Sequence, residues 1–364
     1  MKTQLKPLLY LIPVSLSFWP PIILAAIIYW QLNGHLLLFI PVFLFIITPI
    51  LDQIWGNDPQ PEPTVEKNSL AHWYFRGLPL FCVPSYCLLI CTTPVVINLE
   101  NLAPIHKLEY IFAVGILGGV IAINVAHELV HRTSLFERSC GGILLSTVTY
   151  AGFKVEHIRH HHVYVATPLD PASSYRNQNL YHFVLQGLFK NPMNAFSIEA
   201  QRLRKKKLPI WGYHNELIGW YSLSLLICLG YGWTSGWLGI LAFISQSFIA
   251  AGLLESVNYI EHYGLRRKPK DGSRWEKVKP CHSWNSNVYW SSIYLFQLPR
   301  HSDHHEIASK HYFNLQLKEN APQLPHSYPS MVLLAYFPPL WYRVMNPRLD
   351  DYFSSNDRET VTTE

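Results

Sequence analysis

Long apolar stretches separated by short polar turns dominate the first 260 residues of the chain. Six of them approach the length of about 20 residues that a helix needs to cross the hydrocarbon core of a membrane. They cover approximately residues 8–30, 35–52, 76–98, 109–127, 215–232 and 236–258. This pattern predicts an all-α integral membrane protein with six transmembrane helices.

Turn-forming residues join these segments into three hairpins. The turns are Asn33-Gly34, a loop near Glu100-Asn101, and Thr234-Ser235-Gly236. We expect residues 1–350 to form a single membrane-embedded domain and the acidic, polar residues 351–364 to form a loose tail. The first apolar segment is too long for a signal peptide and lacks a small-residue cleavage site.

Lysine and arginine gather on one side of the predicted hairpins. Residues 127–215 contain 11 of them and residues 259–364 contain 13, whereas the three outer turns together hold only Lys107. Because cytoplasmic loops carry the excess of these residues, we expect both polar regions and both termini in the cytoplasm. The basic run Arg202-Leu-Arg-Lys-Lys-Lys207 is interpreted as a face for water or lipid headgroups. The alternative is a docking patch for an acidic redox partner.

The overall composition agrees with a membrane protein. Charged residues make up 15% of the chain, against roughly 25% in an ordinary soluble domain. The net charge of +5 is modest and no segment is typical of a nucleic-acid-binding module, so no nucleic-acid partner is predicted. The six cysteines include no Cys-x-x-Cys pair. We therefore interpret them as buried free thiols and not as iron–sulfur ligands or a disulfide framework.

Nine of the eighteen histidines fall into four short clusters, each beside an apolar segment. Imidazole is the commonest neutral nitrogen ligand for a transition metal, and residues at i and i+4 stack on one face of a helix. Each i, i+4 pair can therefore present two ring nitrogens to one metal, and the neighbouring histidines can turn towards a second. The candidate ligands are His127 with His131, His157 with His161 and its neighbour His162, His262, and His301 with His305 and its neighbour His304. The sequence predicts a polynuclear metal site at the cytoplasmic face.

The remaining histidines and the nearby carboxylates have less certain roles in this pattern. A lone histidine is more often a hydrogen-bonded core residue than a ligand, and His35, His72, His106, His182, His214 and His326 are interpreted so, with His160, His282 and His311 as intermediate cases. Neutral ligands leave a metal site cationic, so carboxylates should compensate its charge and orient the rings. The candidates are Glu128, Glu156, Asp170, Glu255, Glu261 and Asp303. We favour Glu255, because a charge so near the membrane is costly unless it is functional or paired, and retain Asp303 beside it.

The histidine motifs resemble those of the membrane-bound alkane 1-monooxygenases. The first two boxes of that family are similar to His127-Glu-Leu-Val-His131-Arg132 and to Glu156-His-Ile-Arg-His-His-His162 with the following Thr-Pro-Leu-Asp. Asn258-Tyr-Ile-Glu-His-Tyr-Gly-Leu265, His282-Ser-Trp-Asn-Ser286 and Arg300-His-Ser-Asp-His-His305 resemble the later signature, the segment after it and the third box. The resemblance covers about residues 40 to 350. Desaturases and sterol hydroxylases share the histidine spacing but not the signature at Glu261 or the third box.

This resemblance implies a non-haem diiron enzyme of the bacterial inner (plasma) membrane. Nine histidines, at the positions given above, would hold two irons at the cytoplasmic ends of the helices. With O2 as co-substrate, the enzyme would convert the terminal methyl of a medium- or long-chain alkane into a primary alcohol. Electrons would come from NADH through rubredoxin reductase and rubredoxin. An apolar tunnel between the spans would admit the alkane from membrane lipid, and Phe43, Leu44, Phe45 and Ile47 are candidates to set its depth, with ordinary packing as the alternative.

The chain departs from the family pattern at His160, Val130, Arg132 and Pro299, none of which is a candidate ligand. The motifs His-Glu-Leu-x-His-Arg and Thr-Pro-Leu-Asp also resemble the xylene side-chain monooxygenases. An alkyl-aromatic side chain or a lipid acyl chain therefore stays open as the substrate.

Two other classes of protein fit the pattern less well. His127-Glu-x-x-His131 also marks zinc proteases, but such a site needs one further ligand and leaves six clustered histidines without a role. A metal transporter would place its ligands through the bilayer, whereas these histidines gather at one face.

Overall fold

The computed structural model describes residues 2–58, 65–270 and 274–361. Within these ranges the chain forms helices and three isolated β-bridges but no strand, which confirms the predicted all-α class. The elements are α1 (Lys2–Leu9), α2 (Leu11–Ser15), η1 (Leu16–Phe18), α3 (Trp19–Trp30), η2 (Gly34–Leu38), α4 (Phe39–Val42), η3 (Phe43–Ile47), α5 (Thr48–Trp55), α6 (Leu70–Ile97), α7 (Pro104–Leu117), η4 (Gly118–Ile123), α8 (Asn124–Val130), α9 (Leu135–Thr147), α10 (Phe153–Glu156), η5 (His157–His161), α11 (His162–Tyr164), α12 (Leu180–Lys205), α13 (Glu216–His262), η6 (Pro280–His282), α14 (Tyr289–Tyr294), α15 (His301–Glu306), η7 (Tyr312–Asn314), α16 (Tyr328–Ala335) and α17 (Pro338–Val361).

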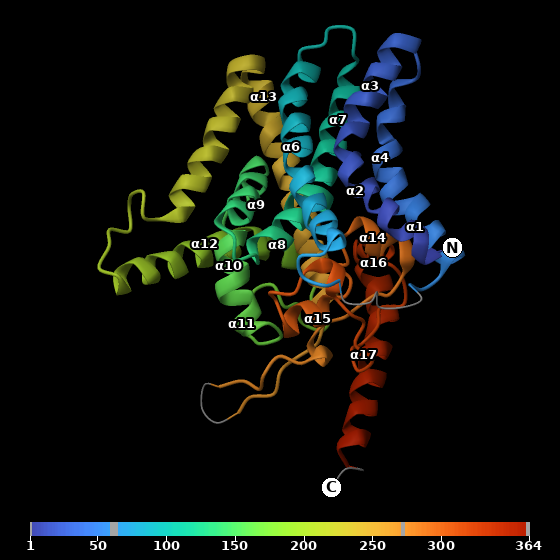
Figure 1. Ribbon diagram of the computed structural model, residues 1–364, viewed down its shortest axis with the longest axis vertical. Helices are drawn as coiled ribbons and strands as arrows, with labels where there is room; N and C mark the ends of the chain where they lie inside the picture. The colour runs from blue at the N-terminus through green and yellow to red at the C-terminus, as the bar shows by residue number, and fades with distance from the viewer. Residues whose placement is uncertain (1, 59–64, 271–273, 362–364) are drawn as a thin grey trace.

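Five helical segments among the described residues are long and apolar enough to cross a membrane. They are Lys6–Trp30, Gly34–Trp55, Leu70–Ile97, Pro104–Val130 and Glu216–His262. The fifth segment is α13, whose backbone leaves the helical region at Ser235 and Gly236. Figure 1 shows α13 as two arms that meet at an apex, and a Cβ at Gly239 would lie 2.1 Å from the carbonyl oxygen of Tyr231. The single segment thus contains both of the last two predicted stretches.

The turns between the long helices and the histidine-bearing elements lie at opposite ends of the bundle (Figure 1). The loop from α3 to η2, the loop from α6 to α7 and the apex of α13 lie at the top of the view. Elements α8, α10, α11 and α15 lie lower, towards the end from which α17 projects. The described elements that carry the candidate ligands therefore meet at one end of the bundle.

Small residues allow α7 and η4 to pack closely against the second arm of α13. A Cβ at Gly115 would lie 2.7 Å from the Cβ of Ile249, and a Cβ at Gly118 would lie 2.7 Å from the Cβ of Ala250. In a membrane the hydrophobic effect does not drive helices together, because lipid tails are as apolar as the side chains. Close approach of the backbones instead stabilises the pair through van der Waals packing. The contact holds the segment that leads into α8, and so to His127, against the helix that ends at His262.

Buried carboxylates anchor the segment that precedes α15. Asp52 accepts hydrogen bonds from the backbone N–H groups of Trp290 (2.7 Å) and Ser291 (3.1 Å), which are orphan donors at the start of α14. Asp58 pairs with Lys6 (2.7 Å) and with Arg300 (2.8 Å), the residue immediately before α15. These contacts tie the third histidine cluster to the N-terminal part of the chain.

The end of the chain is helical, and the loose attachment expected for residues 351–364 stays a prediction. Helix α17 continues to Val361, so residues 351–361 are helical, while residues 362–364 lie outside the described residues. Asp350 on this helix pairs with Arg176, with 2.8 Å between Oδ2 and Nη2. The organisation of residues 1–350 as a single domain stays a prediction.

Candidate metal centre

All nine candidate ligands lie together in two groups at one end of the bundle. His127, His131, His157, His162 and His304 form a five-histidine group, and His161, His262, His301 and His305 form a four-histidine group. Within each group one ligand atom from every residue lies within 4.8 Å of all the others. The groups adjoin each other, because the ring centroids of His162 and His305 are 4.5 Å apart.

The ring nitrogens of the five-histidine group crowd around a common centre. The Nε2 atom of His157 lies 3.0 Å from Nε2 of His131 and 3.0 Å from Nε2 of His162, and the latter lies 3.1 Å from Nε2 of His304. An Nε2 atom carries either one hydrogen or one lone pair, so this chain of contacts cannot be satisfied by hydrogen bonds alone. A metal with metal–nitrogen bonds of about 2.1 Å holds neighbouring ligand atoms about 3.0 to 3.4 Å apart. The geometry therefore fits a bound cation.

The four-histidine group has the same character. The Nε2 atom of His301 lies 3.2 Å from Nε2 of His262 and 2.9 Å from Nε2 of His305. The Nε2 atoms of His161 here and of His127 in the other group are buried and have no hydrogen-bond partner. A buried polar atom without a partner is costly, and a metal ion would satisfy both atoms. The residues of each group thus fit a transition metal.

The assignment of ligands within the second histidine motif differs from the i, i+4 expectation. His157 and His161 do not share a group; His157 belongs with His162, five residues on. The reason is that η5 is a π-helical turn, in which the backbone N–H of His162 donates to the carbonyl of His157. The wider turn brings residues i and i+5 into register and sends His161 to the other group.

Burial favours the neutral form of five of the clustered imidazoles, which is the form that binds a metal. Burial lowers the pKa of His157 and of His162 well below the usual histidine value, and neighbouring histidines lower it further. The same causes lower the pKa values of His301, His304 and His305. Neutral rings retain the lone pair that binds a metal, so the electrostatics of the site favour a cation over protons.

Two acceptors orient rings of the four-histidine group from behind, and a third polar group, the Glu261 carboxyl, lies beside the group. Oδ2 of Asp170 lies 3.0 Å from Nδ1 of His161. Oε1 of Glu261 lies 3.3 Å from Nδ1 of His301, but neither of these two buried atoms makes a hydrogen bond. The carbonyl oxygen of His282 lies 3.3 Å from Nδ1 of His262. An acceptor at Nδ1 fixes the tautomer that leaves Nε2 free for a metal. Burial alone would raise the pKa of Asp170, but His161 and the hydrogen bond from Ser173 lower it overall.

The two carboxylates favoured from the sequence, Glu255 and Asp303, make other contacts. Glu255 accepts hydrogen bonds from Tyr150, from Nδ2 of Asn191 (2.9 Å) and from Nδ2 of Asn258 (3.4 Å). It thereby joins α13 to α12 and to the turn before α10. Among the described contacts, none joins Glu255 to a clustered histidine. Its cost so near the membrane is offset by these hydrogen bonds.

Asp303 on α15 contacts lysines and a backbone N–H group of the following segment instead of the clustered histidines. Its carboxylate pairs with Lys310 (2.7 Å) and Lys318 (3.1 Å) and accepts from the backbone N–H of Gln316 (2.8 Å). It holds α15 against the segment that follows, and its role is to position the helix rather than an individual ring.

The intermediate histidines stand outside both groups. Nε2 of His160 lies 2.9 Å from the carbonyl oxygen of Leu169, and Nδ1 of His311 lies 3.3 Å from Glu128. The ring of His282 lies 3.3 Å from Glu276, although its carbonyl faces His262. These contacts explain why the additional histidines of the boxes do not join the metal-capable groups.

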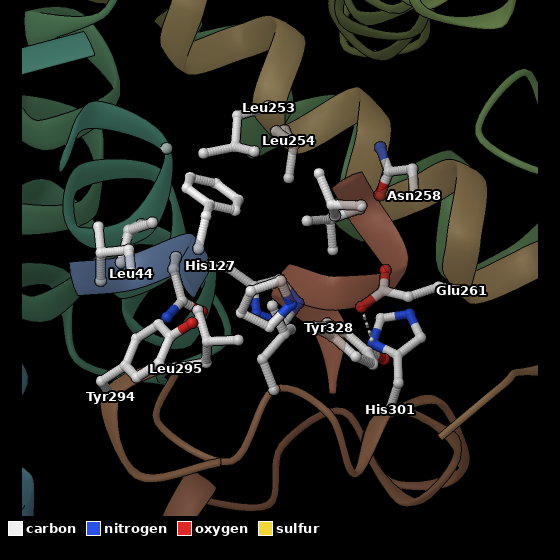
Figure 2. Close-up of a pocket in the computed structure, with 18 of the residues that line it drawn as sticks. Leu44, His127, Leu253, Leu254, Asn258, Glu261, Tyr294, Leu295, His301 and Tyr328 are labelled. Carbon is white, nitrogen blue, oxygen red and sulfur yellow. Dashed lines mark ion pairs between the residues drawn. The ribbon is translucent and has the colours of Figure 1, made fainter. Parts of the chain in front are cut away.

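An apolar cavity of about 60 Å³ opens directly onto the histidines (Figure 2). His127 and His157 of one group and His301 of the other line it, and its remaining wall is largely aliphatic and aromatic. Figure 2 shows Leu253 and Leu254 across the cavity from His127, with Glu261 beside His301. The cavity therefore exposes both candidate metal positions to one apolar space.

A second, larger apolar cavity of about 680 Å³ adjoins the first. It is formed by residues of α4, η3, α7, α12, α13 and α16. Phe45 and Leu253 line both cavities. These two side chains stand where an apolar molecule would pass from the outer cavity to the inner one.

Sequence reasoning missed several polar residues of the inner cavity. Asn124, Tyr294 and Tyr328 line it, and Nδ2 of Asn124 is buried without a hydrogen-bond partner. Asn124 stands three residues before His127 on α8, a spacing that could have identified it, because residues at i and i+3 share a helix face. The two tyrosines lie on elements far from His127 in the sequence, and no local sequence pattern indicates that they line the cavity.

Comparisons with known proteins identify the relatives of this site. The chain is 43% identical to alkane 1-monooxygenase 1 of Pseudomonas aeruginosa over 319 residues, which is 87% of this chain and 84% of that protein. The chain belongs to the alkane 1-monooxygenase family. It is also 44% identical to alkane 1-monooxygenase 2 of Alcanivorax borkumensis over 317 residues, covering 86% of this chain and 83% of the relative.

The wider family and a more distant relative agree with this membership. The fatty acid desaturase family model matches residues 106–335, which contain both histidine groups. The xylene/toluene monooxygenase hydroxylase component of Pseudomonas putida is 29% identical over 256 residues, or 70% of this chain and 68% of that protein. This family member is an integral membrane enzyme whose clustered histidines are suited to non-haem iron.

Proposed function

We propose that this enzyme hydroxylates the terminal methyl group of medium- or long-chain alkanes at a pair of non-haem irons. The observation that carries the proposal is the apolar inner cavity, whose wall contains His127 and His157 from one histidine group and His301 from the other. A hydrocarbon in this cavity would present its end to both metal positions and would meet few polar groups.

The nine histidines would hold the metals, five at one position and four at the other. When bound, the two irons supply the redox chemistry that activates O2. The chain contributes by fixing the ligands, through Asp170 and the carbonyl of His282 behind the rings, and by surrounding the site with apolar side chains that exclude water.

The two adjoining cavities support a substrate that enters from membrane lipid. Each methylene transferred from water contributes about 0.8 kcal/mol, which binds a long chain but does not distinguish its carbons. Selection of the terminal carbon must then come from shape. The inner cavity has room for the end of a chain, and the outer cavity would hold the remainder behind Phe45 and Leu253.

Electrons would reach the site from NADH through rubredoxin reductase and rubredoxin. The six cysteines are free and the chain has no Cys-x-x-Cys pair with which to hold a redox centre of rubredoxin type. A separate donor protein is therefore part of the proposal. The exposed lysines at the end of α12, Lys205–Lys207, are one basic surface that such a partner would meet.

We also propose six membrane crossings with both termini and the histidine groups in the cytoplasm of a bacterial cell, at its inner membrane. The break in α13 supports two crossings by that segment, and the unequal distribution of lysine and arginine supports the orientation.

The test combines metal analysis with product identification. Detergent-purified, iron-loaded protein would be supplied with NADH, rubredoxin, rubredoxin reductase and O2, together with n-alkanes, xylene and a fatty acyl substrate. We expect about two irons per chain and a primary alcohol from the alkane. Two irons with only a benzylic alcohol would replace the alkane by an alkyl-aromatic substrate. One zinc without iron, from iron-replete cells, would overturn the oxygenase proposal.

A further inference from the structure

A third group of metal-capable side chains lies at the end of the bundle opposite the two histidine groups. It consists of His35 in η2, at the turn after α3, and of His106 and Glu109 in the first turns of α7. Figure 1 shows these elements at the top of the bundle, far from α15. The group is independent of the proposed alkane chemistry.

The two imidazoles converge on a single carboxylate. Nδ1 of His35 and Oε1 of Glu109 form a hydrogen bond of 2.6 Å, and Nδ1 of His106 forms one of 2.9 Å with Oε2 of the same side chain. A bound ion would replace these two hydrogen bonds and widen the spacing of the atoms. The two rings meet edge to face, with 4.8 Å between their centroids. Two histidine nitrogens and a carboxylate form a ligand set that proteins use for zinc, with a fourth position left to water.

The surrounding backbone accommodates this arrangement closely. A Cβ at Gly34 would lie 2.3 Å from Cδ2 of His106, so only glycine allows the turn to cover that ring. The side chain of Asn33 accepts a hydrogen bond from the backbone N–H of His35 (2.9 Å), which fixes the residue that closes the group. The turn is thus shaped around the His106 ring.

Charge and access both favour a cation at this position. The side chain of Glu109 is 9% exposed, so its carboxylate is largely shielded from water. The adjacent Lys107 does not neutralise it, because Nζ of Lys107 donates to the carbonyl of Ile97 (2.8 Å). The side chain of His35 is 57% exposed, which provides a path from solvent to the group.

We propose that His35, His106 and Glu109 form a binding site for a divalent transition metal ion, with Zn²⁺ as its probe. The bound ion ties the turn between the first two membrane segments to the start of α7. The site is a brace for the end of the bundle and takes no part in oxidation.

Zinc binding to the iron-loaded, detergent-purified full-length protein tests this site. After dialysis against micromolar Zn²⁺, we expect the parent to hold one more zinc per chain than His35→Gln or Glu109→Gln. The matched control is His182→Gln, because His182 is exposed on α12 and belongs to none of the three groups; it should equal the parent. Equal zinc in all four proteins would overturn the proposal.

Iron content and cobalt absorption make the result specific. Iron measured in the same samples should stay constant, and a zinc gain matched by iron loss would show displacement at the histidine groups and overturn the site. Co²⁺ should give visible absorption bands in the parent and in His182→Gln and none in His35→Gln. Because His35 is exposed, its substitution leaves the fold intact, which circular dichroism verifies. Failure here leaves alkane hydroxylation untouched, so the two proposals are judged separately.

Discussion

Oδ2 of Asp170 lies 3.0 Å from Nδ1 of His161, on the side of the ring away from the metal-facing nitrogen. The same oxygen accepts the hydroxyl of Ser173 at 2.5 Å, so the carboxylate is itself held in place. Asp170 therefore sets both the tautomer and the direction of a candidate ligand that it does not replace.

Removing the charge of Asp170 should weaken metal binding. We expect Asp170→Asn to lower iron affinity by about 10- to 100-fold, as for other groups that orient ligand histidines. Competition with a chelator measures the change. Asp350→Asn, which alters only the exposed pair with Arg176, is the control. Equal iron retention in the two variants would show that Asp170 has no orienting role.

The division of the histidines into ligands and bystanders can be tested with one variant from the third box and one from the second. We expect His305→Ala, which leaves the four-histidine group with three ligands, to hold one iron per chain or fewer and to lose activity by more than about 100-fold. His160→Ala should keep both metals, because His160 belongs to neither group. Elemental analysis measures the iron content of both variants, and alcohol formation measures their activity. Two irons per chain in the His305 variant would contradict the ligand assignment.

Chain-length selection should depend on two of the four candidate tunnel residues. Leu44 and Phe45 line the inner cavity, whereas Phe43 and Ile47 do not. We expect Leu44→Ala and Phe45→Ala to extend the range of accepted alkanes, and Phe43→Ala and Ile47→Ala to leave it unchanged. Gas chromatography of the alcohols gives the profile. Thermal unfolding must accompany it, because a buried Leu→Ala change costs about 2 to 5 kcal/mol.

Gly187 should tolerate no larger side chain. A Cβ at this position would lie 2.4 Å from Oε2 of Glu255, whereas a Cβ at Gly219 would meet no atom within 4 Å. We expect Gly187→Ala to destabilise the protein by about 1 to 3 kcal/mol through overpacking. Gly219→Ala, also in a helix, should be neutral or mildly stabilising. Melting temperatures that move equally would contradict this view of the contact.

The stability contributed by Glu199 should disappear in acid. Burial would raise the pKa of Glu199, but the guanidinium groups of Arg202 and Arg159 lower it overall. Because the folded-state pKa is depressed, the contribution is present above the unfolded pKa of about 4.3 and is lost as the pH falls through the folded pKa. The difference in melting temperature between the parent and Glu199→Gln should therefore be larger at pH 7 than at pH 4. A constant difference would contradict the ion-pair account.

The clustering of the nine candidate ligands could be predicted from the sequence, but their partition into two groups could not. Clustered histidines beside apolar segments have few other uses, and all nine meet in the structure. The prediction that His157 and His161 belong to one group assumed an α-helical period, in which residues i and i+4 share a face. No residue type in this segment indicates a π-helical turn. For the same reason the five-residue separation of His157 and His162 carried no signal.

The orienting carboxylates show a second limit of sequence reasoning. Glu255 stood out because of its position in an apolar stretch, yet its partners Tyr150 and Asn191 lie far away in the chain. Asp170 reaches His161 because the chain between them folds back through Ala166, whose φ of 58° is unusual for a residue other than glycine. Contacts of this kind depend on tertiary packing, and they produce no periodic pattern in the sequence.

The π-helical turn at His157–His161 has a consequence for the length of the motif. Deleting the single residue Ile158 would preserve every histidine, yet it would reduce the separation of His157 and His162 to that of an ordinary α-helical turn and rotate His161 relative to both. Each ring would then point to a different position with the composition of the site unchanged. We therefore expect a one-residue deletion in this turn to disrupt the arrangement of the histidine rings more than a substitution at most of its residues would.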